Sequence, residues 1–165
     1  MDNKFLCVMA GYDKNTENKL LCLQNKLFES GFVGKQTNNI PQHITLGTYE
    51  VSRENEIREL IKKVSDKTNS FNITFNHLGI FGGSEVLFVA PDPNRELIDL
   101  KEYFGPSHNW TPHTTMLIDK AEIIYEALPI VANEFTAFDG WVENIYLYEF
   151  WPTRYISQET MRDNL

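Results

Sequence analysis

Residues 41–49 read PQHITLGTY, and this short stretch contains the pattern on which the fold depends. Alternate residues of a β-strand point to the same face of a sheet. In a strand that begins at His43, the side chains of His43 and Thr45 therefore project together, while Ile44 and Leu46 project into the core. The stretch predicts a strand that presents one imidazole and one hydroxyl on its polar face.

The same His-x-Thr pattern recurs in residues 111–118, TPHTTMLI. His113 and Thr115 share one face of this second predicted strand, and Met116 and Ile118 lie on the other. Each copy follows a proline by one or two residues and begins a strand. Two copies in equivalent surroundings are less expected by chance than one, so the repetition favours a functional pair of sites.

Apolar residues in the rest of the chain follow the periods of strands and helices in turn. Strands are predicted at residues 5–10, 43–49, 71–76, 85–90, 113–118 and 141–150. Helices are predicted at residues 16–30, 52–64, 94–104 and 121–133, the last interrupted at Pro129. Thr16 and Ser52 are the expected N-caps of the first two helices, and Gly31 is expected to end the first in a left-handed conformation.

The two rounds of strand, helix and strand that begin at the two motifs have similar lengths. The separation along the chain from His43 to Phe81 nearly equals that from His113 to Phe150. This match suggests an internal duplication, with the two histidines placed symmetrically about a shared groove. No segment rich in Gly, Ser or Pro separates independent units, so we expect residues 1–165 to form a single domain.

Charge and hydropathy exclude several classes of partner. The formal net charge is −8, from 23 acidic and 15 basic side chains, so long-range electrostatics would repel a long duplex DNA. A small phosphorylated ligand meets only its cleft and remains compatible with this charge. No apolar run approaches the ~20 residues needed to cross a bilayer, and the protein is expected to be cytoplasmic, free of membranes and monomeric.

The cysteines and histidines lack the spacing of a metal site. Cys7 and Cys22 lie in apolar runs and are expected to be small buried residues, not reactive thiols. The chain contains neither C-x-x-C nor H-x-x-x-H, so neither a structural metal nor another cofactor is predicted.

With His43-Ile44-Thr45 and His113-Thr114-Thr115, the sequence resembles the two-histidine phosphoesterase superfamily, which includes the 2′-5′ RNA ligase-like proteins and cyclic phosphodiesterases. The resemblance extends from the first predicted strand to the strand that ends near Phe150. It implies a bilobal, duplicated α+β fold in which antiparallel sheets line a central groove and helices lie outside. It also implies that one histidine acts as general base and the other as general acid, and the sequence does not say which is which.

The residue types suit hydrolysis of a phosphodiester. An imidazole, with a reference pKa of about 6.5, can take a proton from a nucleophile or give one to a leaving oxygen at neutral pH. The hydroxyls of Thr45 and Thr115 can donate to the non-bridging oxygens, whose charge grows in the transition state. The predicted activity is that of a metal-independent phosphodiesterase acting on a small cyclic or 2′-5′-linked nucleotide.

The substrate and two other classes of function stay open. Candidate substrates are 2′,3′-cyclic phosphate ends, 2′-5′-linked oligonucleotides and cyclic signalling nucleotides. The main alternative is a non-catalytic binder of a phosphorylated nucleotide or RNA end; a metal hydrolase is the weaker alternative, because no carboxylates accompany the motifs. No Arg or Lys follows either motif closely, so phosphate recognition would depend on hydroxyls, backbone amides and a distant cation such as Lys35 or Arg154.

Further candidate residues lie near predicted strand ends. An aromatic ring at such a place could stack on a nucleobase, and the substrate-binding candidates are Tyr12, Phe81, Tyr148 and Trp151, together with Arg154. His77 and His108 have neither Thr nor Ser two positions on, and a structural role is favoured for both.

Overall fold

The computed structural model describes residues 3–83 and 85–163, which form an α+β fold of four α-helices, one short 3₁₀ helix (η1) and seven strands. In chain order the elements are β1 (Phe5–Tyr12), α1 (Lys14–Glu29), β2 (His43–Glu50), η1 (Val51–Arg53), α2 (Glu54–Lys67), β3 (Phe71–Ile80), β4 (Val86–Pro91), α3 (Arg95–Glu102), β5 (Thr114–Ile118), α4 (Ala121–Glu134), β6 (Phe138–Phe150) and β7 (Arg154–Thr160). None of the described helices is both long and apolar enough to span a membrane.

The strand order shows the duplication directly. The strands pair antiparallel in the order β2-β1-β6-β3-β4-β5, and β7 pairs with β6 off this path. The chain splits into two halves, β1-α1-β2-α2-β3 and β4-α3-β5-α4-β6. The counterparts are β1 and β4, β2 and β5, and β3 and β6. Exchanging them gives the same strand order read from the opposite edge of the sheet. The predicted duplicated α+β fold is therefore confirmed, and β2 and β5, which carry the second and later residues of the two motifs, occupy equivalent edges.

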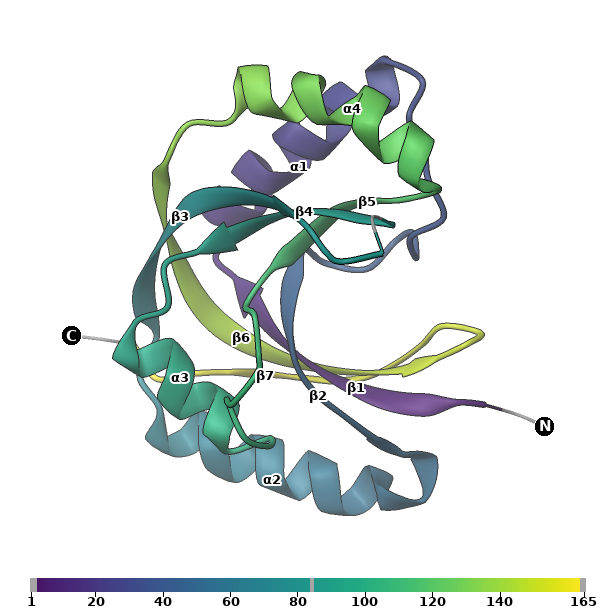
Figure 1. The fold of residues 1–165 in the computed structure, drawn as a ribbon. Helices are drawn as coiled ribbons and strands as arrows, with labels where there is room; N and C mark the ends of the chain where they lie inside the picture. Colours follow the sequence, from purple (N-terminus) through teal and green to yellow (C-terminus); the bar gives the residue numbers. More distant parts are fainter. Residues whose placement is uncertain (1–2, 84, 164–165) are drawn as a thin grey trace.

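One long strand joins the two lobes into a single hydrogen-bonded sheet. Residues 138–142 of β6 pair with β3, and residues 142–150 pair with β1. β7 continues the edge of β6 beyond β3 and has no counterpart in the duplicated pattern. The sheet bends at β6, so that β3, β4 and β5 form the upper part of Figure 1 and β1, β2 and β7 the lower part.

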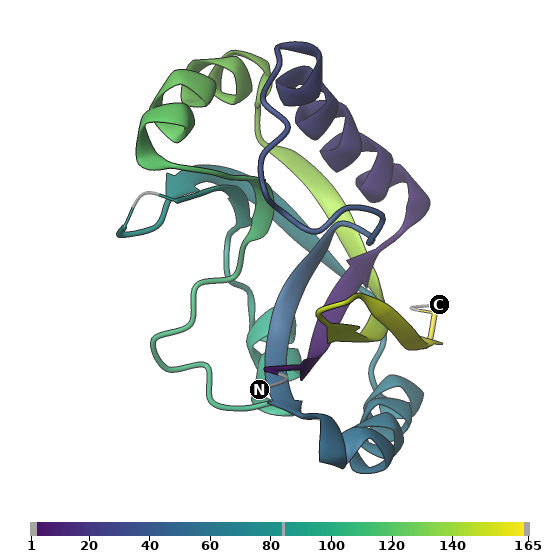
Figure 2. The same cartoon turned by 90° about the vertical axis from the view of Figure 1, so that its right-hand side faces the viewer.

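Helices cover the outside of both parts. α1 and α4 pack against each other above the sheet, and α2 and α3 lie below it (Figures 1 and 2). The main core lies between these helices and the sheet, and the buried residues Leu6, Val8 and Ala10 of β1 face it. Cys7 and Met9, on the opposite face of β1, belong to a second apolar cluster on the groove side of the sheet. β1 is therefore buried on both faces, which explains its continuous apolar run.

The first helix begins earlier than its sequence suggests. Asp13, not Thr16, is the N-cap of α1, because the Asp13 carboxylate accepts the backbone N–H of Thr16 at 3.0 Å. The Thr16 hydroxyl instead accepts the backbone N–H of Trp141 at 3.0 Å, across the fold. The predicted left-handed Gly31 is confirmed, with a φ of 91°.

Two other predicted helix features are wrong. Ser52 lies inside η1, and α2 begins at Glu54 with no side-chain cap. α4 continues through Pro129 to Glu134, because its buried face, Ile124, Ala127 and Val131, packs into the core on both sides of the proline. Tertiary packing here outweighs the one backbone hydrogen bond that proline cannot donate.

Candidate active site

Both histidines are fixed to the main chain in the same way. The Nδ1 of His43 lies 2.8 Å from the carbonyl oxygen of Pro41, and the Nδ1 of His113 lies 2.9 Å from that of Thr111. A carbonyl oxygen only accepts hydrogen bonds, so each Nδ1 carries the proton and donates it. Each neutral ring then has its lone pair on Nε2, the nitrogen required for proton transfer.

A β-bulge follows each motif at the same position. Thr45 pairs with Met9 and Gly47 with Val8, which leaves Leu46 as the extra residue of β2. Bulges bend a strand locally and re-aim its side chains. Leu46 is fully buried, so the bulge lets the chain return an apolar residue to the core directly after the polar Thr45.

The second motif has the equivalent bulge. Thr115 pairs with Phe88 and Leu117 with Leu87, which leaves the buried Met116 as the extra residue of β5. We call each motif, together with its strand, a half-site. The two half-sites therefore share even their β-bulge, which lies directly after the last threonine of each motif. His113 differs from His43 in one respect: it lies directly before the strand and not at its first residue, so the predicted start of this strand is one residue too early.

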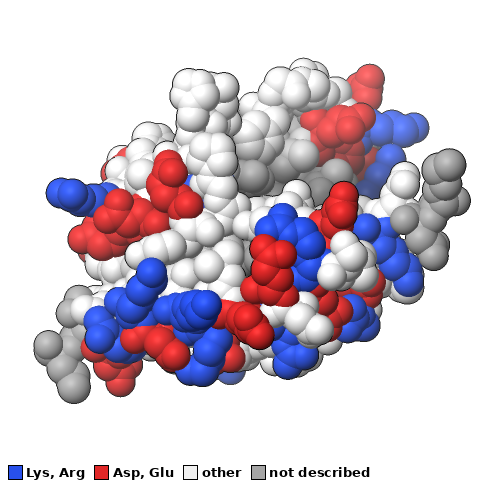
Figure 3. All heavy atoms as spheres, turned by 90° about the horizontal axis from the view of Figure 1, so that it is seen from below, with Lys and Arg blue, Asp and Glu red and all other residues white. Residues whose placement is uncertain are grey.

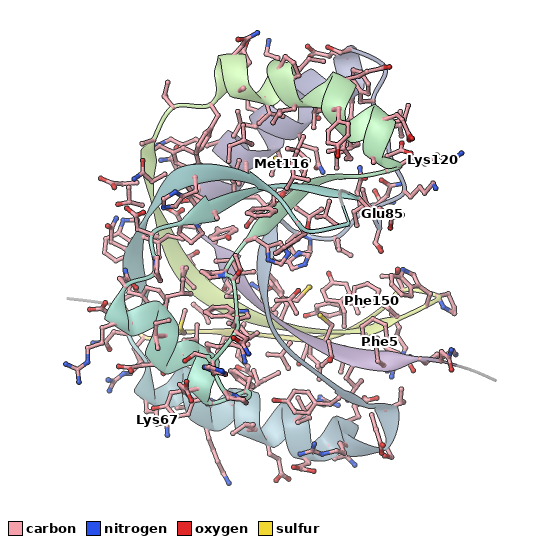
Figure 4. The ribbon with its side chains drawn as sticks, in the orientation of Figure 1. Phe5, Lys67, Glu85, Met116, Lys120 and Phe150 are labelled. Atoms are coloured by element: carbon pink, nitrogen blue, oxygen red, sulfur yellow. The ribbon has the colours of Figure 1, made fainter. Side chains whose placement is uncertain are left out.

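The first motif and the two threonines of the second line a cavity of about 670 Å³ between the two parts of the sheet. His113 is not among the residues that line this cavity; it precedes the lining residue Thr114, and its charge acts on the pKa of His43. His43, Thr45 and Thr115 line it, and the segment 36–42 forms one wall. Phe5 and Phe150, on neighbouring strands, together with Trp151, provide apolar lining; Figure 4 shows Phe5 and Phe150 in the lower part of the fold. Among the described residues that line this cavity there is no Asp, Glu, Lys or Arg.

Two phenylalanines hold the ring of His113. Its centroid lies 4.6 Å from that of Phe81, nearly edge to face at 85°, and 5.3 Å from that of Phe88. Gly79 makes room for Phe88, because a Cβ at Gly79 would lie 2.4 Å from that ring. Phe81, a predicted base-stacking residue, is thus placed beside the second motif, where it orients an imidazole.

Burial lowers the pKa of both histidines below the ordinary value. For His43 the largest cause is desolvation; the bond to Pro41 opposes it, and the positive charge of His113 lowers the pKa further. For His113 desolvation also dominates, opposed by the bond to Thr111. The two imidazoles therefore influence each other's titration. Near neutral pH both rings are mainly uncharged.

The structure places the other candidates in three different environments. Trp151 is 61% exposed, lines the cavity and donates from Nε1 to the Thr37 hydroxyl at 2.9 Å. Tyr148 is buried, its ring plane lies at 7° to that of Phe150, and Tyr155 also packs against it. Protein side chains therefore occupy the space in which a base would stack. Tyr12 is also buried, and its hydroxyl bonds Thr114 at 2.6 Å. Stacking of a base on Tyr12 or Tyr148 does not fit this packing.

Arg154 is bound by carboxylates outside the cavity. Its guanidinium contacts Glu149 and Glu54, each at 2.6 Å. Its predicted part in phosphate recognition is therefore not supported, because both ion pairs would compete with a phosphate.

Several residues of the site carry no sequence pattern that marks them. Gln24 of α1 donates to the carbonyl of Met116 at 3.0 Å and accepts from Gln42 at 2.7 Å. Cys7 lines the cavity 3.9 Å from the Thr45 hydroxyl, and burial raises its pKa to about 11, so the thiol is protonated. Cys22, for which burial is also predicted, is instead exposed. The contacts of Gln24 and Cys7 join residues far apart in sequence and have no local signal.

The described residues contain no group of three or more His, Cys, Asp or Glu side chains arranged to hold a metal ion. The polar groups that line the cavity are the His43 imidazole, the Cys7 thiol, hydroxyls and amides, with aromatic rings beside them.

Two His-x-Thr motifs at equivalent places of a duplicated α+β fold agree with the two-histidine phosphoesterase superfamily. The chain belongs to the 2′-5′ RNA ligase superfamily, whose family model matches residues 29–150. No curated protein sequence matches it significantly.

Solved structures share the fold over nearly the whole chain. E. coli LigT in its apo form matches with a TM-score of 0.66 and 18% identity, covering 96% of this chain and 98% of that one. E. coli LigT complexed with 3′-AMP matches with a TM-score of 0.64 and 20% identity, covering 98% and 99%. The protein TT0787 of Thermus thermophilus matches with a TM-score of 0.66 and 15% identity, covering 98% and 100%.

Proposed function

We propose that the protein is a metal-independent phosphodiesterase that hydrolyses a small cyclic or 2′-5′-linked nucleotide diester by paired-histidine acid/base catalysis. The observation that carries this proposal is the matched pair of imidazoles, each with Nδ1 bound to a carbonyl two residues earlier and Nε2 left for proton transfer. Binding alone does not require this duplicated arrangement. A charged side chain would hold a phosphate more tightly than a neutral imidazole does.

The two histidines receive different roles from their electrostatics. Burial and the positive charge of His113 both disfavour the protonated form of His43, so we assign His43 as the base and His113 as the acid. The active form of the pair is then a neutral His43 and a protonated His113. His43 Nε2 removes a proton from the attacking water as the new P–O bond forms. His113 Nε2–H gives its proton to the departing ester oxygen as the old P–O bond breaks.

The threonines complete the phosphate site. Thr45 and Thr115 both line the cavity and are only partly buried, so their hydroxyls are available to donate to the two non-bridging oxygens. Such donors stabilise the charge that grows on these oxygens in the transition state. No step of this scheme requires a metal ion.

The uncharged cavity favours a diester over a monoester. A phosphodiester carries one negative charge, which the hydroxyls and a protonated His113 can match. A phosphomonoester carries about −1.5 to −2 at pH 7 and meets no Lys or Arg among the described lining residues. The cavity volume of about 670 Å³ is within the range of small-ligand sites, and Phe5, Phe150 and Trp151 provide apolar surface for a base or ribose.

A ribonucleotide substrate agrees with the ligand of a structural relative. LigT of E. coli has been crystallised with 3′-AMP. Opening a 2′,3′-cyclic phosphate of adenosine at O2′ yields this type of monoester. Among the candidate substrates we therefore place 2′,3′-cyclic phosphates and 2′-5′-linked oligonucleotides before cyclic signalling nucleotides.

Among the described residues, the face of the molecule shown in Figure 3 has no continuous basic patch that would bind a long polyanion. Figure 3 shows Lys and Arg interspersed with Asp and Glu on the face seen from below. Ion pairs also occupy several of the basic side chains at or beside α2: Arg53 with Glu56, Lys62 with Asp66, and Arg154 with Glu54. This pattern supports a small nucleotide or oligonucleotide as the partner.

A substrate panel with and without a chelator tests the proposal. It contains 2′,3′-cyclic mononucleotides, a 2′-5′-linked dinucleotide, its 3′-5′ isomer and a cyclic dinucleotide. Turnover that is unaffected by chelator is expected for at least one of the first two. Turnover abolished by chelator indicates a metal hydrolase, and saturable binding without product indicates a non-catalytic binder; either result contradicts the proposal.

A further inference from the structure

The two edge strands of the sheet, β2 and β5, contact each other at the motifs, although they are not paired in the sheet. A side chain makes the connection. Thr114, the middle residue of the second motif, donates from its hydroxyl to the carbonyl oxygen of His43 at 2.9 Å. Thr114 is 1% exposed, so water does not compete for this bond.

A second hydroxyl fixes the direction of the Thr114 proton. Tyr12 of β1 lies 2.6 Å from the Thr114 hydroxyl oxygen. The single Thr114 proton goes to the carbonyl of His43, which can only accept, so the Tyr12 hydroxyl must donate to Thr114. Burial raises the pKa of Tyr12 above its ordinary range, and the phenol keeps the proton that it donates. The result is a directed chain from Tyr12 through Thr114 to His43.

This chain connects the backbones that carry the two imidazoles. Each ring follows its own main chain, because its Nδ1 is bound two residues back. Thr114 is the neighbour of His113, and its hydroxyl binds the carbonyl of His43. One hydrogen bond thus spans from one half-site to the other.

The duplicated half does not repeat this connection. Ile44, the middle residue of the first motif, is apolar and fully buried. A polar residue is needed at this position only once, because one hydroxyl is sufficient to join β5 to β2. This explains why the second motif has a less apolar core face than the first.

We propose that Thr114 is a positioning residue that sets the separation and relative orientation of the His43 and His113 imidazoles. The expected loss of kcat rests on the proposed function. The expected change in the relative placement of the two imidazoles does not. General acid and base must act on the same phosphorus from fixed places, and a misplacement of about 1 Å can lower a rate by roughly 10²-fold. Loss of the Thr114 hydroxyl should therefore affect the chemical step more than substrate binding.

The kinetic experiment compares three variants on the best substrate of the panel. Thr114→Val keeps the shape and removes the donor, Thr114→Ser keeps the donor, and Thr16→Val is the matched control. Thr16 is equally buried and also makes a bond between distant segments, but to Trp141, outside the cavity. We expect T114V to lower kcat at least tenfold with KM within about twofold, T114S to retain at least a third of kcat, and T16V to lower Tm without lowering kcat.

Three kinetic outcomes contradict the inference. They are an unchanged kcat in folded T114V, an equal loss in T114S, and an equal loss in T16V, since the last would show a general effect of removing a buried hydroxyl. If T114V does not fold, Tyr12→Phe replaces it. We expect this variant, which removes the donor to Thr114, to lower kcat by about threefold or more, and an unchanged kcat would count against the chain.

A second measurement does not depend on activity. ¹⁵N NMR of the imidazoles reports the pKa of each histidine in parent, T114V and T16V. We expect T114V to shift the pKa of His43, because its spacing from His113 changes, while T16V leaves it unchanged. If the parent hydrolyses no substrate, the proposed function is wrong, and this titration alone decides whether Thr114 positions the pair; an unshifted His43 in T114V overturns that role.

Discussion

The indole Nε1 of Trp110 donates to the carbonyl oxygen of Thr45, 3.2 Å away, and so joins the loop before the second motif to the strand of the first. The opposite relationship also exists. The loop before the first motif contacts β5, where the backbone N–H of Ile118 donates to the Gln36 side chain at 3.1 Å. Each histidine is therefore preceded by a loop that lies against the other half-site, which couples the two halves of the site mechanically.

The contact between Trp110 and Thr45 leads to a stability prediction. Trp110→Phe keeps an aromatic ring near Lys101 but removes the donor to the Thr45 carbonyl. Loss of one such hydrogen bond should lower the free energy of unfolding by roughly 0.5–1.5 kcal/mol. Urea denaturation checks this value. Exposed Trp141→Phe is the control for loss of an indole, and an equal effect in both variants would mean that the bond to Thr45 contributes nothing specific.

The catalytic assignment predicts the effect of removing either imidazole. His43→Ala and His113→Ala should each lower kcat by roughly 10²-fold or more, the usual scale for a general acid or base. His77→Ala is a suitable control, because His77 lies on β3 outside the two motifs. Its side chain is exposed, and its Nε2 lies 2.6 Å from the Asp92 carboxylate. Steady-state rates on one cyclic substrate compare the three variants. A parental rate in either H43A or H113A would remove that histidine from the mechanism.

The sequence predicted this pair because the relevant signal is local. Alternation in a strand places His43 beside Thr45, and His113 beside Thr115, without any tertiary information. The duplicated strand order also left a trace, in the similar spacing of the two rounds. The alternation, however, does not reveal the bulges after Thr45 and Thr115, which depend on pairing with β1 and β4.

The features that the sequence did not predict depend on contacts between distant segments. Tyr12 lies at the end of the first strand and was a candidate for stacking on a base. Its ring is instead buried, and its hydroxyl forms a hydrogen bond with that of Thr114. Arg154 was expected near phosphate, but Glu54 and Glu149 bind it. β7 itself was missed, since its burial pattern is mostly exposed and carries no apolar alternation.

The lowered pKa values of the two histidines predict the pH dependence of the rate. Activity requires a neutral His43, so kcat/KM rises with pH through the pKa of His43, which lies below the ordinary value. It requires a protonated His113, so kcat/KM falls as pH rises through the pKa of His113, which is also lowered. The profile should be bell-shaped with its maximum below about pH 6.5. An optimum above pH 7.5 would contradict the lowered pKa values on which this profile depends.

The same shifts predict how stability varies with pH. Both histidines have a lower pKa in the folded protein, so the unfolded chain binds more protons between the folded and unfolded pKa values. The stabilising contribution is therefore fully present above about pH 6.5 and is lost as pH falls through that value toward the folded pKa values. Urea midpoints at pH 7.5 and pH 5 check this for the parent and for the double variant H43A/H113A. We expect a smaller decrease in the double variant, and equal decreases would contradict the prediction.

The neutral cavity predicts that added positive charge changes ligand preference. Thr48 is exposed, lines the cavity and lies on β2 beyond the first motif, so Thr48→Lys adds a cation without replacing a proposed catalytic group. In the parent, a 3′-phosphomonoester should bind more weakly than a non-hydrolysable diester of the same nucleoside, because the second charge has no partner. T48K should tighten monoester binding by about fivefold or more at low salt and affect the diester less. Asn76→Lys, which adds the same charge on an exposed part of β3, should change neither, and calorimetric titration at two salt concentrations separates these outcomes. If the parent already prefers the monoester, the uncharged lining does not select the substrate.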